Sequence, residues 1–184
     1  YAFNDQVTLL NTYTRKTTRL EERLKTLKPD AGTSLYDAIY LAAPGLRDRE
    51  GRHVIVAISD GGDTTSSKKF KDALDAAQKA DAIFYPIVVV PITNPAGRNT
   101  AGEHALETLA ASTGGRAFYP TVVAQLDRAF ADILRDLRTQ YLLGYYPTRV
   151  PVGDGSYHTV RVEIPQRTEL RISTRTGYYG ESSR

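Results

Sequence analysis

The segment that most constrains the fold is Arg52–Ser67, with the sequence RHVIVAISDGGDTTSS. Residues 54–58 form an uninterrupted apolar run rich in β-branched side chains. A run this short that ends in a turn sequence is typical of a strand buried on both faces. The loop at residues 59–63, SDGGD, follows at its carboxyl end. In an open α/β sheet this is the edge where ligands bind, so we expect the functional residues here.

The composition of this loop favours a cation over an anion. It combines two aspartates and two glycines with several hydroxyl side chains, and no lysine or arginine lies between Val54 and Ser67. Oxygen ligands of this kind suit a hard divalent cation such as Mg2+. A phosphate-binding loop would instead carry basic residues or a GxxxxGK sequence.

Strand-like and helix-like patterns alternate along the chain. Strands are predicted at 54–58, 82–90 and 116–119, and helices at 18–27, 34–42, 68–80, 103–112 and 123–140. This alternation between residues 50 and 140 predicts an α/β fold with a doubly wound, mainly parallel sheet flanked by helices. Before it, residues 1–10 are expected to form a hairpin, and Thr18-x-x-Glu21 is a capping-box pattern for the first helix.

The periodicity changes after residue 140. YLLGYYP at 141–147 is predicted to be a strand, and apolar residues alternate with polar ones at 159–164 and 170–173. These patterns predict a small antiparallel appendage. We therefore divide the chain into an α/β domain at 1–140 and a carboxyl-terminal β extension packed on it at 141–184. The tyrosine pairs at 145–146 and 178–179 are interpreted as packing between the two.

Composition excludes several classes of function. The net charge is only +3, and the basic residues are dispersed, so no nucleic-acid-binding surface is indicated. No apolar run approaches the length of a membrane span. The absence of cysteine excludes disulfides and thiolate metal sites.

Several motifs together resemble the von Willebrand factor type A (VWA) domain, and more closely a bacterial subgroup found in exported proteins. The similarity extends over essentially the whole chain. The motifs, in order, are GTSLYDAI at 32–39, VIVAISDGGDTTS at 54–66, GGRAFYP at 114–120, QYLLGYYP at 140–147, DGSYHTVRVEI at 154–164 and TRTGYY at 174–179.

The resemblance implies a metal-ion-dependent adhesion site. Thr33 and Asp60 would bind the metal, while Ser34, Gly61 and Asp63 would lie behind or around it. The ion would be Mg2+, with Mn2+ or Ca2+ as substitutes, and an open position would accept a carboxylate from a protein partner. The implied protein is a non-enzymatic binding module of an extracytoplasmic or secreted protein.

One part of the family pattern does not occur in this sequence. The Asp-x-Ser-x-Ser motif that ends the family's first strand has no counterpart, and the hairpin at residues 1–10 corresponds to the second and third strands. The resemblance therefore implies that the first strand, its helix and most of the second strand precede residue 1. The metal site would be partial, and the chain's own amino-terminal segment or a second copy are further candidate partners.

Two alternative functions stay open at this point. The fold could be a metal-independent structural scaffold of the cell envelope, with Asp60 acting as a helix cap and Thr33 bonding local backbone. It could also be a metal-dependent hydrolase using Asp60 and Asp63. The sequence offers no GxSxG motif, and its histidines are scattered, which disfavours the hydrolase.

Overall fold

The computed structural model describes residues 1–28, 30–89, 99–148, 155–167 and 169–180. Most of the predicted loop at 91–102 and the start of the predicted turn at 153–155 lie outside these residues. The described chain is a mixed α/β structure with one parallel strand pair and two short antiparallel pairs.

The parallel pair is the centre of the fold. Strand β3 (His53–Ser59) pairs with β4 (Ala82–Val88) in register from His53↔Ala82 to Ser59↔Val88. On its other side, β4 forms a parallel bridge between Ile87 and Phe118. The predicted strand at 116–119 is therefore reduced to one bridging residue beside β4.

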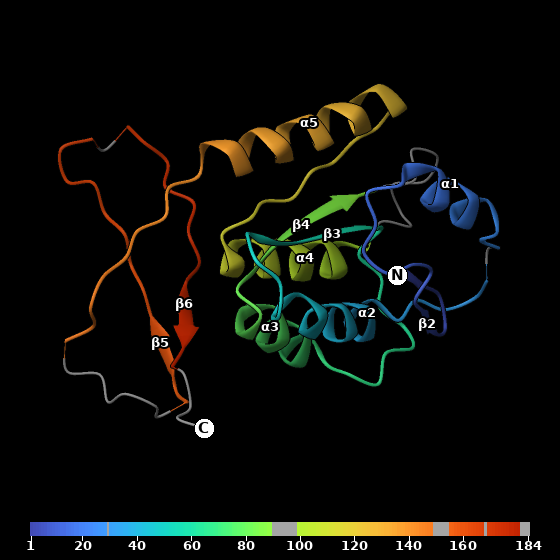
Figure 1. Ribbon diagram of the computed structural model, residues 1–184, viewed down its shortest axis with the longest axis horizontal. Coiled ribbons are helices and arrows are strands. Elements are labelled where there is room, and N and C mark those ends of the chain that lie inside the picture. Colours follow the sequence, from blue (N-terminus) through green and yellow to red (C-terminus); the bar gives the residue numbers. More distant parts are fainter. Residues whose placement is uncertain (29, 90–98, 149–154, 168, 181–184) are drawn as a thin grey trace.

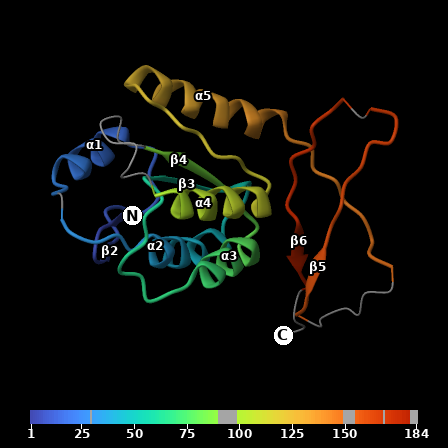
Figure 2. The same cartoon turned by 180° about the vertical axis from the view of Figure 1, so that it is seen from behind.

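Helices lie on both faces of this pair, as Figures 1 and 2 show from opposite sides. On one face are α2 (Leu35–Ala42), α3 (Phe70–Lys79) and α4 (Thr100–Thr113). On the other is α5 (Val123–Thr139), which is the longest described helix. A 3-10 turn, η1 (Pro44–Leu46), follows α2.

Side chains that alternate along the strands build the core on each face. Ala57, Phe84 and Val88 pack with apolar residues of the three-helix face: Leu35, Ile39, Ala73, Ala77, Leu106, Leu109 and Ala110. Tyr85 and Ile87 instead pack with Phe118 and with Ala129 and Ile133 of α5. Strand β4 is thus buried on both faces.

The amino-terminal region is a small hairpin followed by a separate helix. β1 (Ala2–Phe3) and β2 (Val7–Thr8) pair antiparallel, so the predicted hairpin forms. Helix α1 runs over Thr17–Lys25, with Lys16 at its N-cap and no side-chain capping bond, so the predicted capping box is wrong. Leu20 and Leu24 of α1, and Leu27 just after it, are exposed because no described element covers them.

The carboxyl-terminal residues form a ribbon of β5 (Tyr157–Thr159) and β6 (Gly177–Tyr179), paired antiparallel. The expected strand at 141–147 is irregular in the structure. The ribbon contacts the α/β core, since the Tyr179 hydroxyl donates to Asp75 Oδ1 of α3 at 2.8 Å. Nearby, the Thr176 N–H donates to the Ser112 carbonyl of α4 at 3.1 Å.

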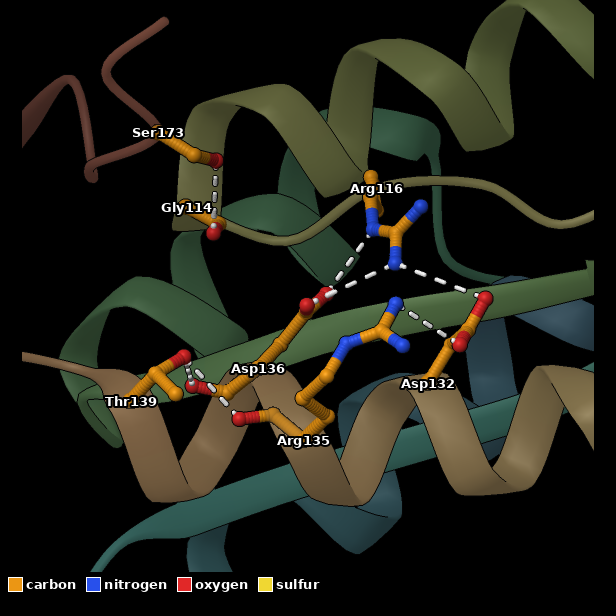
Figure 3. A network of polar contacts seen from close by, with 7 residues as sticks. All are labelled: Gly114, Arg116, Asp132, Arg135, Asp136, Thr139 and Ser173. Carbon is orange, nitrogen blue, oxygen red and sulfur yellow. Dashed lines mark hydrogen bonds and ion pairs between the residues drawn. The ribbon is translucent and has the colours of Figure 1, made fainter. Parts of the chain in front are cut away.

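A polar network holds α5 against the segment that follows α4 (Figure 3). Arg116 Nε donates to Asp136 Oδ2 at 2.8 Å, and its Nη2 lies 3.9 Å from Asp132 Oδ2. The hydrogen bond to Asp136 raises the pKa of Arg116, although burial acts in the opposite direction. Arg135 pairs with Asp132 at 2.8 Å along the same helix. The network fixes α5 over β4 and the Phe118 bridge.

Candidate functional site

The predicted site lies at the carboxyl end of β3, where backbone bonds join two segments that are distant in sequence. The Thr33 carbonyl accepts the N–H groups of Thr64 at 2.9 Å and Thr65 at 3.3 Å. The Thr33 N–H donates to Thr64 Oγ1 at 2.9 Å. The GTS segment and the hydroxyl-rich loop after β3 therefore pack side by side.

Asp60 is exposed at the beginning of this loop. Its Oδ1 accepts the N–H of Gly62 at 3.0 Å, a local turn of the kind that aspartate commonly forms. Ser59 Oγ similarly accepts the Gly61 N–H at 3.2 Å. Among the contacts of the described residues, the carboxylate of Asp60 bonds its own loop, and none joins it to a helix amino terminus.

Gly61, the residue directly after Asp60, allows the loop to lie against Gly102 at the start of α4. Gly61 has a φ of +88°, and a Cβ there would lie 2.7 Å from the Gly102 carbonyl carbon. A Cβ on Gly102 would lie 1.9 Å from the Gly61 oxygen. Asn99 caps the helix by accepting the Gly102 N–H at 2.9 Å. Only glycine fits on both sides of this contact.

Asp63 caps a helix from a distant part of the chain. Its Oδ1 accepts the N–H of Tyr36 in the first turn of α2 at 3.1 Å and the hydroxyl of Ser66 at 2.6 Å. Ser66 Oγ in turn accepts the N–H of Asp37 at 3.1 Å. The loop thus satisfies two amide groups that the helix itself leaves unpaired.

Asp37 makes the reciprocal connection from α2 to the loop. Its carboxylate accepts the N–H of Lys68 at 2.7 Å and that of Ser67 at 2.9 Å, just before α3. Burial by itself raises the pKa of Asp37, but these two amide groups, the Ser67 hydroxyl and the charge of Lys68 together hold the pKa below its ordinary value. The start of α2 and the start of α3 are therefore fixed to each other.

Ser34 is buried beneath this junction and has a different role from the one its position suggests. It is the N-cap residue of α2, yet its side chain makes no capping bond. Its hydroxyl donates to the Asp5 carbonyl at 2.9 Å and lies 2.8 Å from Thr65 Oγ1. Ser34 joins the amino-terminal hairpin to the loop, and Asp63 and Ser66 supply the capping.

The described residues do not form a complete metal site. No group of three His, Cys, Asp or Glu side chains suited to a metal occurs among them. The hydroxyls and carboxylates at 33–34 and 59–67 are nevertheless hard oxygen donors, which fit Mg2+ chemistry. Thr33 and Asp60 are the predicted ligands. Of the other predicted residues, Gly61 packs against α4, Ser34 bridges to the amino-terminal hairpin, and Asp63 caps α2.

Sequence reasoning missed the residues that hold the loop in place. Asn99 was assigned to a loop, although Asn followed by Thr-Ala-Gly-Glu is a recognisable helix start. Ser66 and Asp37 were not linked to each other. No local pattern could reveal that link, because the two residues are 29 positions apart.

Comparisons with known proteins show a fold relationship. No protein-family model matches the chain, and no curated protein matches it. The conserved hypothetical protein BatB from Bacteroides thetaiotaomicron is similar in structure, with a TM-score of 0.50 and 16% identity over 67% of this chain and 70% of that one. An uncharacterized membrane-spanning protein from Vibrio fischeri has a TM-score of 0.39 and 19% identity, over 72% of each chain.

The similarity to BatB is a shared α/β fold, since identity this low shows no more. Within the described residues, no helix is both long enough and apolar enough to cross a membrane.

Proposed function

We propose that this chain is a VWA-type protein-binding module, in which Asp60 and Thr33 hold part of a divalent-cation site. The observation that carries the proposal is the joining of the Thr33 segment to the loop after β3 through Thr64 and Thr65. Two motifs that the family resemblance assigns to one site, 27 positions apart in the sequence, belong to one packed unit at one end of the strand.

The chemistry of the two side chains supports this role. Mg2+ takes oxygen ligands, keeps several waters, and is commonly held by only one or two protein carboxylates. Asp60 would supply the negative charge and Thr33 a neutral hydroxyl. A cation so weakly neutralised favours one more anionic ligand, which is why the partner group would be a carboxylate. No catalytic residue is assigned, because the proposal involves no bond-breaking step.

The doubly wound arrangement of the family is part of the same proposal. Three helices on one face of β3 and β4, with α5 on the other, are what such a sheet requires. The resemblance in fold to BatB supports it. Further ligands would come from a segment outside the described residues, either upstream in the same protein or in a second copy. The similarity to exported bacterial proteins supports an extracytoplasmic location.

The alternative of a metal-independent scaffold is supported by a different observation. The carboxylates of Asp63 and Asp37 accept hydrogen bonds at the starts of helices, so these two acidic side chains already have a structural role. In that case Asp60 would be an ordinary turn residue. The two functions differ in one measurable property, the binding of Mg2+ at Asp60.

Isothermal titration calorimetry with Mg2+ and Mn2+ tests the proposal. We expect Asp60→Asn to abolish the binding heat while the circular dichroism spectrum stays unchanged, because Asp60 is exposed and supplies charge instead of core volume. Asp30→Asn is the matched control: Asp30 is also exposed and also accepts a local amide, that of Ala31 at 2.8 Å. Identical Mg2+ titrations for the parent protein and Asp60→Asn would favour the scaffold.

A further inference from the structure

Asn99 lies beside Asp60, although the two residues come from different loops. Asp60 directly follows β3, and Asn99 is the residue before α4. The close contact between Gly61 and Gly102 brings the start of α4 against the loop after β3. As a result, the position that a Cβ on Gly62 would take is 3.2 Å from Asp60 Oδ1 and 3.6 Å from Asn99 Nδ2. The carboxylate and the amide therefore lie next to each other over Gly62.

Each of these two side chains uses one polar atom to bond nearby backbone and keeps the other free. Asp60 Oδ1 accepts the Gly62 N–H at 3.0 Å, and Asn99 Oδ1 accepts the Gly102 N–H at 2.9 Å. No contact among the described residues engages Asp60 Oδ2 or Asn99 Nδ2, and both residues are exposed. Because the oxygen of the Asn99 amide faces an N–H group, Nδ2 is the free donor.

A free amide donor beside a cation ligand can select the group that binds the cation. A carboxylate has two oxygens, and both accept hydrogen bonds. When one oxygen of a ligand carboxylate binds the cation, the other remains available to a neighbouring N–H donor. An asparagine suits this position because its amide is neutral. It donates to the ligand without repelling the cation, as the charge of a lysine or arginine would.

We propose that Asn99 is a specificity-determining residue of the cation site, whose Nδ2 donates a hydrogen bond to the carboxylate that a protein partner places on the cation. This role rests on the proposed function, because it requires a cation at Asp60. The start of α4 is then a third segment of the site, beside the Thr33 segment and the loop after β3. A carboxylate is favoured over a neutral carbonyl, since a hydrogen bond to a charged acceptor contributes more free energy.

Calorimetric titration with Mg2+ over a series of acetate concentrations tests this role. Acetate is the probe because it is a simple carboxylate, and chloride replaces it in the reference buffer so that the ionic strength stays constant. If acetate binds the cation-loaded protein, it strengthens Mg2+ binding by the same factor by which Mg2+ strengthens acetate binding. We expect this strengthening in the parent protein, and none with acetamide, the neutral analogue of acetate.

Two substitutions separate ligand binding from helix capping. Serine and aspartate are both good N-cap residues, so Asn99→Ser and Asn99→Asp keep a capping oxygen and remove the amide donor. We expect Asn99→Ser to weaken acetate binding on the order of tenfold, the effect of one hydrogen bond to a charged group, and to leave Mg2+ binding in chloride unchanged. Asn99→Asp should bind Mg2+ more tightly and lose the effect of acetate, because its charge attracts the cation and repels the carboxylate. Gln166→Glu, an exposed amide-to-acid change between β5 and β6, is the control and should match the parent protein.

The outcomes distinguish the role of Asn99 from the proposed function itself. A parent protein that binds no Mg2+ would overturn both. Mg2+ binding that acetate does not strengthen would overturn only the role of Asn99 and leave the cation site at Asp60 standing. The same holds for an equal acetate effect in Asn99→Ser and the parent protein, which is the result that a purely structural helix cap would give.

Discussion

Removing the carboxylate of Asp63 should destabilise the whole fold, although Asp63 lies in a loop. Its Oδ1 caps the first turn of α2 through the Tyr36 N–H and also orients Ser66, which caps the next amide. Replacing an N-capping side chain by alanine costs about 1 kcal/mol. Losing a negative charge at a helix amino terminus adds about 0.3–1 kcal/mol.

The two effects together predict a loss of about 2 kcal/mol for Asp63→Ala. In a chain of this size that corresponds to a decrease in Tm of about 4–8 °C. Asp63→Asn keeps an oxygen acceptor and loses only the charge, so its decrease should be smaller. Urea denaturation followed by circular dichroism measures both, and an unchanged m-value would show that the unfolded state is unaffected.

Asp60→Ala is the control for this series, because Asp60 is exposed and bonds only within its own loop among the described contacts. We expect it to change stability by less than about 0.5 kcal/mol. Equal destabilisation by Asp63→Ala and Asp60→Ala would refute the assignment of Asp63 as the cap of α2. A Ser66→Ala, Asp63→Ala double variant should lose less than the sum of the single losses, because the two residues act on the same helix end.

Three further predictions concern other parts of the chain. The two ring nitrogens of His53 face the carbonyl oxygens of Arg49 and Ala80, and these contacts raise the pKa of His53. The stability that His53 contributes should therefore be complete below its ordinary pKa and should decline as the pH rises through the raised pKa. His53→Gln should remove this pH dependence in urea denaturation. Burial and the bond to Asp75 raise the pKa of Tyr179 to about 12, so Tyr179→Phe should remove a phenol that titrates near pH 12 in ultraviolet titration. Gly115→Ala should destabilise strongly, because its Cβ would lie 2.0 Å from the Phe84 oxygen, whereas Gly144→Ala, with open space around it, should not.

The elements that sequence predicts best are those whose partners are close along the chain. The β3–α3–β4–α4 succession repeats apolar patterns that each identify one element, and the observed bounds differ from expectation by a few residues at most. The start of α4 moved from Glu103 to Thr100, since the Asn99 cap was not recognised. A local sequence pattern is enough to predict an element when the core residues that pack against it come from neighbouring elements of the chain.

Prediction failed where an element needs a distant or additional partner. The apolar run of β3 was predicted to be buried on both faces, yet Val56 and Ile58 are exposed because no described strand lies beside them. The residues at 141–147 have a strand-like composition but remain irregular. Alternation predicts that a segment can form a strand, and pairing decides whether it does.

The three carboxylates near the candidate site show the same limit of prediction from sequence. Composition alone treats Asp37, Asp60 and Asp63 as similar acidic groups near one loop. The structure separates them by their hydrogen bonds: Asp63 and Asp37 each accept amide groups at helix starts, whereas Asp60 accepts one amide within its own turn. The distinction depends on contacts between residues about 30 positions apart, which no local pattern contains.

Because Asp63 and Asp37 hold the loop in place while Asp60 does not, the loop can support a cation site that has few protein ligands. Asp63 and Asp37 fix the loop to α2 and α3, and the close contact of Gly61 with Gly102 fixes it to α4. The backbone that carries Asp60 is thus positioned before any ligand arrives, so little conformational entropy would be lost on binding. A site with few protein ligands needs such preorganisation, because each side chain held in place adds to affinity without an ordering cost. The capping aspartates would then influence cation binding only through the position of Asp60, and Asp63→Asn should weaken Mg2+ binding far less than Asp60→Asn.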